Sequence, residues 1–370
     1  MITRRLGGFL AVTLLMTTAM AAQDVSPQLS LYGYVKVDAL YETGRSSHGN
    51  YAIWAADPGD SEGAFHLTAN QTRLGLKVTV PEWRGFAITA LVEADFYGGG
   101  AENKALPFMR HAYLQVRKKG FTLIAGQYWD IINPLNPYTL NYPVLWGAGN
   151  LGYRRPQLRL RQEISLGAHR LVMEGGIFRT IAGDLDGDGV DDGVAAGFPT
   201  FQGRVAGRFK LSDSTWLRVG VSGHYGRSRG DQDLQSRSLN LDFTLSLGSG
   251  LTVMGEWFSG RNLKAYLGGI VQDMNPGTGV EIRSRGFYVN IQVRPVRRWF
   301  FSAGYGRDDP DDDDLALGGR SRNAAWFAVL EWRMNPHLRA GLEVSAWKTG
   351  YRDQASEKTL RLQHAWILTF

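Results

Sequence analysis

Cysteine is absent from this chain of 370 residues, so neither disulfide bonds nor thiolate metal ligands contribute to its fold. Long apolar segments are nearly absent as well. Beyond residue 22, nothing approaches the ~20 consecutive apolar residues that a transmembrane helix needs. Only helices and closed β-barrels satisfy all their backbone hydrogen bonds in lipid. The chain therefore either stays out of the bilayer or crosses it as a closed barrel.

Strong charge imbalance and enzyme motifs are missing too. The formal net charge is +6, and it falls to about +4 if Arg4 and Arg5 are removed with an amino-terminal signal. This excess is too small to indicate a nucleic-acid partner. The seven histidines are scattered without the spacing of metal ligands, and no catalytic motif is present. The sequence therefore predicts no enzymatic activity and no required cofactor.

Residues 1–22 form a unit of their own. A positively charged start precedes the apolar run of residues 6–16, and Ala19 and Ala21 follow in the pattern of a signal-peptidase site. We predict a secretory signal peptide that is cleaved after Ala21 or Ala22. An uncleaved membrane anchor is the alternative, although the apolar run is short for a span.

The last stretch of the chain, residues 360–370, gives the clearest strand pattern. One parity is apolar apart from His364, and the other parity is mainly polar. Because successive side chains of a strand point to opposite faces, this stretch predicts a strand with one apolar face. A final strand that ends on an aromatic residue, here Phe370, is typical of bacterial outer-membrane barrels. An edge strand of a soluble sandwich is the alternative.

The same alternation recurs along the chain and, with 46 glycines and 12% aromatic residues, favours many short strands joined by turns. We predict about sixteen strands, an even number as in bacterial barrels. The predicted strands are residues 29–42, 66–80, 86–97, 108–118, 121–127, 153–166, 170–182, 199–211, 215–226, 237–247, 251–265, 280–294, 299–307, 321–334, 338–350 and 358–370.

The connections between these strands alternate between tight turns and long segments. The long segments are residues 43–65, 128–152, 183–198, 266–279 and 308–320. A barrel inserted from one side has short periplasmic turns and long outer loops, whereas a soluble sandwich has no reason to segregate them. Trp83, Phe121, Trp216 and Trp299 lie beside tight turns, where an aromatic girdle is expected. We expect residues 23–370 to form an all-β transmembrane antiparallel barrel.

Several short motifs resemble those of Gram-negative general porins, and among them the DcaP-like trimeric porins. The motifs are residues 31–38 (LYGYVKVD), 72–75 (TRLG), 93–96 (EADF), 110–114 (RHAYL), 125–127 (AGQ) and the terminal Phe370. The resemblance implies a sixteen-stranded homotrimer in the outer membrane, surrounded by lipid and lipopolysaccharide. It also implies passage of small hydrophilic solutes, often anions such as dicarboxylates. DcaP-like members often carry a helical segment before the barrel, whereas only residues 23–28 separate the predicted signal from the first predicted strand here.

The polar parity of the strands predicts the lining of a lumen. Basic residues are frequent on it, and rings of arginine in a pore favour anions. The predicted lining residues are Lys36, Arg73, Arg155, Arg159, Arg161, Arg204 and Arg208. The alternative is that these side chains pair with acidic neighbours such as Asp38, Glu93, Asp95 and Glu163 and only fill the wall.

Residues 128–152 form a long aromatic segment with no charged residue after Asp130. Its aromatic residues include Trp129, Tyr138, Tyr142 and Trp146. Porin barrels commonly fold this loop into the lumen, so the resemblance predicts a constriction loop. A loop this long and aromatic is expected to be packed. The alternative is an outer-surface loop buried in trimer contacts.

Two acidic segments remain. Asp184, Asp186 and Asp188 match the early positions of a calcium loop, with Asp192 at a later ligand position, but Ala195 replaces the bidentate glutamate. A weak Ca²⁺ site and a solvated acidic loop both fit. Residues 308–314 have no ligand spacing, and they either bridge divalent ions to lipopolysaccharide or form a solvated run.

A porin for passive diffusion of small solutes, with a preference for anions such as carboxylates, is the function that the sequence favours. An adhesin or structural barrel would have a filled lumen and functional outer loops. An outer-membrane lipase would need a Ser–His pair on the lipid-facing parity, where His364 is the only mid-strand histidine, and no serine can be assigned to it.

Overall fold

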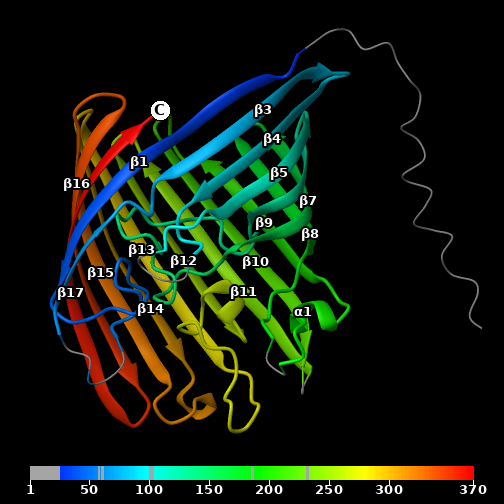
Figure 1. The fold of residues 1–370 in the computed structure, drawn as a ribbon. Coiled ribbons are helices and arrows are strands. Elements are labelled where there is room, and N and C mark those ends of the chain that lie inside the picture. The colour runs from blue at the N-terminus through cyan, green and yellow to red at the C-terminus, as the bar shows by residue number, and fades with distance from the viewer. Residues whose placement is uncertain (1–25, 57–58, 60–61, 100–103, 185–186, 231–232) are drawn as a thin grey trace, which may run out of the picture.

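The computed structural model describes residues 26–56, 59, 62–99, 104–184, 187–230 and 233–370 as one closed antiparallel β-barrel (Figure 1). The predicted signal peptide, residues 1–22, lies outside the described residues. Within the described part, no helix is long and apolar enough to span a bilayer. The helical segments of these described residues are α1 (Asp192–Ala195), η1 (Lys264–Tyr266) and η2 (Asp312–Asp314).

The barrel is built from seventeen strand segments, each paired with its neighbours in an antiparallel register. These are β1 (Gln28–Glu42), β2 (Ala64–Thr68), β3 (Arg73–Trp83), β4 (Phe86–Asp95), β5 (Phe108–Lys118), β6 (Phe121–Trp129), β7 (Arg154–Leu166), β8 (His169–Phe178), β9 (Thr200–Lys210), β10 (Thr215–Arg229), β11 (Asp233–Leu247), β12 (Leu251–Arg261), β13 (Arg283–Val296), β14 (Trp299–Pro310), β15 (Arg320–Arg333), β16 (Leu338–Tyr351) and β17 (Gln354–Thr369).

The seventeen segments make a barrel of sixteen strands, because β2 and β3 follow one another along the same edge of β1. The sequence predicts one strand over residues 66–80, whereas the structure interrupts it at residues 69–72. Thr72 explains the break, since its hydroxyl accepts a hydrogen bond from the backbone N–H of Lys36 (3.1 Å) and donates to its carbonyl (3.3 Å). The Thr72 hydroxyl thus takes the place of the backbone groups that would otherwise pair with Lys36. The barrel closes where β1 pairs with β17.

The outer face of the barrel is apolar, as the parity of the strands predicts. On β17, Leu360, Leu362, Trp366 and Leu368 are 45–49% exposed, while Arg361 and Gln363 between them are buried on the inner face. Exposed aromatic residues stand beside the short turns, with Trp83, Phe121 and Trp299 at 37–49% exposure. Trp216 does not join this girdle. It lies on the inner parity of β10, opposite Lys210, and its ring contacts Arg208.

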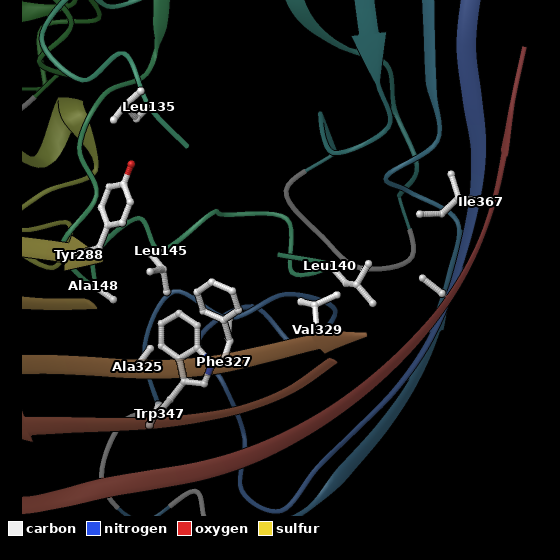
Figure 2. Close-up of a cluster of buried hydrophobic side chains, with 13 residues drawn as sticks. Leu135, Leu140, Leu145, Ala148, Tyr288, Ala325, Phe327, Val329, Trp347 and Ile367 are labelled. Carbon is white, nitrogen blue, oxygen red and sulfur yellow. The ribbon is translucent and has the colours of Figure 1, made fainter. Parts of the chain in front are cut away.

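Part of the barrel interior is a hydrophobic core. Inward side chains of β13 and β15–β17 meet leucines from the connection between β6 and β7, and Figure 2 shows Leu140 beside Val329 and Leu145 beside Phe327. Phe327 and Trp347 are only 2% and 3% exposed. Inner positions of a wide barrel are usually polar, so this packing indicates that one side of the interior binds a loop instead of water.

Gly33 is the tightest point of the closure. Its backbone N–H donates to the Phe370 carbonyl (3.2 Å), and the Phe370 N–H donates to the Gly33 carbonyl (3.1 Å). A Cβ added at Gly33 would lie 2.1 Å from the Arg73 carbonyl oxygen, and its φ of +154° suits glycine best. We expect Gly33→Ala to reduce sharply the fraction of barrel that migrates as the folded form in unboiled gel samples. A φ of this kind strains other residues by ~1–3 kcal/mol, and the backbone clash adds to that cost.

Gly175→Ala is the matched control, because a Cβ there meets only the Gln202 carbonyl oxygen at 3.8 Å. Normal folding of the Gly33 variant, or an equal defect in the control, would contradict this account of the closure.

Candidate functional site on the inner wall of the barrel

The cross-strand register carries the inner face continuously around the barrel. Tyr128 opposes Arg155, Ile124 opposes Arg159, and Thr122 opposes Arg161. Arg204 and Arg208 continue this face on β9, and Lys36 and Arg73 carry it on β1 and β3. All seven predicted basic residues therefore lie on the inner face. Their accessibility differs, and this difference decides what each can contact.

Three of the seven are buried. Lys36 is 2% exposed, pairs with Asp38 at 3.1 Å, and donates to the Leu140 carbonyl at 2.7 Å. Arg155 is 1% exposed and pairs with Asp130 at 2.9 Å. Arg204 forms two hydrogen bonds with Asp242, at 2.7 and 2.9 Å. These three side chains match the alternative in which the basic residues pair with acidic neighbours and only fill the wall. A buried, paired charge does not reach a solute in the lumen.

Around Glu174 the arginines outnumber the carboxylates. Arg159, Arg161 and Arg204 all approach this one glutamate, and the last two lie 3.4 and 3.8 Å from it. Arg161 also pairs with Glu163 at 2.9 Å, yet its side chain remains 37% exposed. Arg73 is 23% exposed and lies 3.5 Å from Glu93. Arg204 also pairs with Asp242, and Arg170 shares Glu163 with Arg161, so four arginines face three carboxylates around Glu174 and one positive charge remains.

Toward the short turns, three arginines stand directly opposite one another on neighbouring strands. Arg170 on β8 opposes Arg208 on β9, which opposes Arg218 on β10. Arg170 pairs with Glu163 at 2.6 Å, and Arg208 stacks on Trp216 at 4.0 Å. Among the described residues, no carboxylate oxygen lies within 4.0 Å of the side-chain nitrogens of Arg208 or Arg218. Like charges directly opposite are unfavourable, so this row is open to an anion.

We use the name basic wall for six inward arginines of β7–β10, leaving out Arg155, which is buried against Asp130. It consists of Arg159, Arg161, Arg170, Arg204, Arg208 and Arg218. The carboxylates that pair with it are Glu163, Glu174 and Asp242. Arg170 and Arg218 are missing from the sequence prediction. Both lie on the inward-facing positions of their strands, so the alternation of side chains could have predicted them. However, β8 has a weak strand pattern, and Arg218 lies near the end of β10.

The connection between β6 and β7, residues 130–153, lies inside the barrel, and we call it the inner loop. Backbone groups of the loop bond to inward side chains of distant strands: Leu135 N–H donates to Glu256 (2.9 Å) and Asn141 N–H to Glu343 (3.3 Å). The Ile132 carbonyl accepts from the Ser222 hydroxyl at 2.7 Å. These bonds hold the loop across the lumen, from Ser222 on β10 to Glu343 on β16.

The predicted aromatic residues of this region separate into two groups. Trp129, Tyr142 and Trp146 come together, with ring centroids 6.2 Å apart for each neighbouring pair. Arg110 and Arg154, which sequence reasoning missed, both donate to the Tyr142 hydroxyl, at 3.2 and 3.4 Å. Tyr138 lies elsewhere and donates to Glu331 on β15. The inner loop therefore presents an arginine–aromatic face on one side and an apolar face on the other.

Among the described residues, no group of three or more carboxylates or histidines is placed to hold a metal ion. Asp186 lies outside the described residues. The Asp184 carboxylate accepts hydrogen bonds from the backbone N–H groups of Gly187 (2.8 Å) and Gly189 (3.0 Å), and Asp192 is buried in α1. Asp188 accepts from Val190 N–H at 2.8 Å. These hydrogen bonds form local turns of the acidic loop, and the Ca²⁺ site stays a prediction.

Residues 308–314 are only partly solvated, with Asp312 and Asp313 exposed and the other aspartates engaged. Asp308 is buried and accepts from the Ser284 hydroxyl at 2.5 Å, while Asp309 and Asp314 pair with arginines. Burial alone would raise the pKa of Asp314, but hydrogen bonds from the side chain and backbone of Arg283 outweigh it and lower that pKa. This segment therefore compensates arginines of the rim.

No protein-family description matches the chain, and no curated protein matches it significantly. Solved structures do. The outer membrane channel DcaP of Acinetobacter baumannii superposes with a TM-score of 0.76 at 14% identity, covering 95% of this chain and 100% of that one. The anion-selective porin from Comamonas acidovorans gives 0.61 at 11% identity, covering 93% and 100%. A trimer form of OmpT from Vibrio cholerae gives 0.55 at 9%, covering 93% and 100%. The chain thus has the sixteen-stranded fold of Gram-negative porins.

Proposed function

We propose that this protein is an outer-membrane porin that lets small hydrophilic solutes diffuse through its lumen and favours anions, carboxylates among them. The observation that carries the proposal is the positive excess of the basic wall. Six arginines face three carboxylates there, and Arg208 and Arg218 have no carboxylate partner among the described residues. Charged rings that line a pore set its ion preference, and arginine favours anions.

The geometry of the basic wall suits weak, repeated contact with a carboxylate. Guanidinium groups offer paired donors that match the two oxygens of a carboxylate. Arg161 and Arg170, with side chains 37% and 51% exposed, are accessible and already engaged with Glu163. When an anion arrives, each arginine exchanges its bond to Glu163 for a bond to the anion. The anion is therefore attracted but bound only weakly. A tightly bound solute would block its own passage.

The inner loop supplies the second part of the proposal, a constriction. Its leucines pack against inward side chains of β13 and β15–β17, so we infer that solutes pass along the side that carries the basic wall. Its anchoring carboxylates Glu256 and Glu343 lie under the loop and are buried. They therefore do not offset the arginines that face the solute.

We place the barrel in the outer membrane as a homotrimer, with the short turns on the periplasmic side. The apolar outer face, the aromatic residues beside the short turns and the amino-terminal signal pattern support the location. The solved structures with this fold include a trimer form of OmpT, which supports the assembly. The lipid around the barrel would be that of an outer membrane, with lipopolysaccharide facing the long loops.

Purified protein in a planar bilayer tests this function. We expect stepwise conductance, and a reversal potential across a potassium chloride gradient that shifts toward the chloride equilibrium potential. The gradient should be kept near 0.1 M or below, where the Debye length of ~10 Å leaves lumen charges effective. Cation selectivity in the wild-type protein would refute the anion preference.

A structural or adhesive barrel is the second candidate, because the hydrophobic core and the inner loop occupy part of the interior. It predicts a correctly folded barrel that conducts no ions. The same bilayer recording therefore separates the two functions.

A further inference from the structure

A buried arginine stands at the base of the inner loop, where the chain returns from the loop to the wall. Arg154 is the first residue of β7, and it lies opposite Trp129, the last residue of β6. It is only 2% exposed. Among the described residues, no carboxylate oxygen lies within 4.0 Å of its side-chain nitrogens. A buried guanidinium without a carboxylate partner needs another source of stabilisation.

Aromatic rings surround this guanidinium. Its central carbon lies 4.8 Å from the ring centroid of Trp129, 5.2 Å from that of Tyr153, 5.6 Å from that of Phe108 and 5.8 Å from that of Trp146. The face of an aromatic ring attracts a cation, and the attraction is strongest where water is excluded. The Nε and Nη1 atoms of Arg154 have no hydrogen-bond partner among the described residues, so the rings stabilise this part of the charge. We call these four rings the arginine cage.

The arginine cage joins parts of the chain that are otherwise separate. Phe108 begins β5 and Trp129 ends β6, whereas Trp146 and Tyr153 belong to the inner loop. The rings also contact one another. Their centroids are 6.2 Å apart for Trp129 and Trp146, and 5.9 Å apart for Trp146 and Tyr153. Through these contacts, one guanidinium links the inner loop to three strands of the wall.

The middle of the inner loop needs such a fixed point because its backbone is strained. Val144 and Leu145 have φ angles of 44° and 65°, in the left-handed region that residues with a Cβ rarely adopt. Leu145 is buried in the hydrophobic core, while the next residue, Trp146, is 4% exposed and belongs to the arginine cage. Arg154 also reaches this segment through Nη2, which donates to the Tyr142 hydroxyl at 3.4 Å. Strained backbone persists only where its surroundings hold it, so loss of the cage should let this segment relax.

We propose that Arg154 is a positioning residue that sets the width of the constriction by holding the middle of the inner loop against β5–β7. This role rests on the channel function proposed above, but it differs from that of the basic wall. Because Arg154 is buried, it acts through the rings and not by contact with a solute. Lysine cannot replace it, since a compact ammonium group does not stack on several rings as a planar guanidinium does.

Hydrogen–deuterium exchange of the folded full-length barrel in detergent, read by mass spectrometry, tests this role. The backbone N–H groups of Trp146 and Ala148 donate within the loop at 2.8 and 2.9 Å, and that of Gly152 donates to the Tyr266 carbonyl at 2.9 Å. We expect Arg154→Lys to make these amides exchange about tenfold faster, because exchange follows the population of the opened loop. Peptides of β17 should exchange as in the wild-type protein, which separates a loosened loop from a destabilised barrel.

Arg361→Lys is the matched control. Arg361 is equally buried, at 1% exposure, but its partners are the Glu42 carboxylate at 3.3 Å and the Ser46 hydroxyl at 2.7 Å. The control should leave the exchange of the inner loop unchanged. Trp129→Leu removes the nearest ring of the cage and should reproduce the faster exchange. The double variant Arg154→Lys/Trp129→Leu should be little faster than either single variant, since both remove the same contact.

Bilayer recording of the same variants measures the constriction itself. Lysine keeps the positive charge, so the reversal potential of Arg154→Lys should equal that of the wild-type protein. Its open-channel current should be noisier, because the loop fluctuates across the lumen. A wild-type barrel that does not conduct would refute the channel alone, since the exchange of the loop is measured without a current.

Three results would overturn the proposal. They are wild-type exchange and wild-type noise in Arg154→Lys, an equal increase of loop exchange in Arg361→Lys, and effects of the two cage substitutions that multiply in the double variant. If Arg154→Lys does not reach the folded form, Trp129→Leu decides, and wild-type exchange of its inner loop would overturn the proposal.

Discussion

Replacing Arg208 and Arg218 by glutamate should change the channel from anion-selective to cation-selective. These two side chains have no carboxylate partner among the described residues and stand directly opposite each other on β9 and β10. The double substitution replaces two positive charges by two negative ones in one cross-strand pair. We expect at least a tenfold change in the chloride-to-potassium permeability ratio, equivalent to ~1.4 kcal/mol. The reversal potential at low salt measures it.

The matched control is Arg237→Glu/Arg285→Glu, which makes the same charge change on the outer face of the barrel. Screening and the intervening wall should leave its reversal potential close to that of the wild-type protein. If both pairs shift the potential equally, the preference comes from overall charge and not from the basic wall. If neither does, the anion pathway lies elsewhere in the lumen.

Lys36→Met should destabilise the barrel by ~3–5 kcal/mol, because it leaves the buried Asp38 carboxylate without its cation. Both side chains are nearly inaccessible, at 2% and 1% exposure, and lie 3.1 Å apart. The substitution also removes the bond from the Lys36 ammonium to the Leu140 carbonyl of the inner loop. We therefore expect a lower urea midpoint of unfolding in lipid vesicles, together with noisier single-channel current as the loop loosens.

The double variant Lys36→Met/Asp38→Asn separates the two effects. Removing both charges should recover most of the lost stability, since an amide can still accept from the Gln363 side chain, 2.8 Å from Asp38 in the wild-type protein. The current noise should remain, because the bond to Leu140 is still missing. A double variant as unstable as Lys36→Met would mean that the lysine acts by packing and not by charge.

The sequence was sufficient for the architecture because alternation is a local property. Side chains on a strand point to opposite faces whatever the strand pairs with, so the outward leucines of residues 360–370 and the inward arginines of residues 153–166 could be identified without coordinates. The alternation of short turns and long loops along the chain then predicted a barrel that is inserted from one side. The break between β2 and β3 escaped this reasoning, since the Thr72 hydroxyl competes with the backbone only once β1 lies beside it.

The tertiary structure alone decided which inward charges remain available. The strand pattern predicted Lys36, Arg155, Arg204 and Arg208 alike as residues that line the lumen, yet the first three are buried. Arg204 pairs with Asp242 on β11, and Lys36 is covered by the inner loop, whose Leu140 carbonyl accepts a hydrogen bond from its ammonium group. Ion pairing depends on distances between strands, which a single strand's pattern does not contain. The same holds for the row of Arg170, Arg208 and Arg218, which requires three neighbouring strands in a particular register.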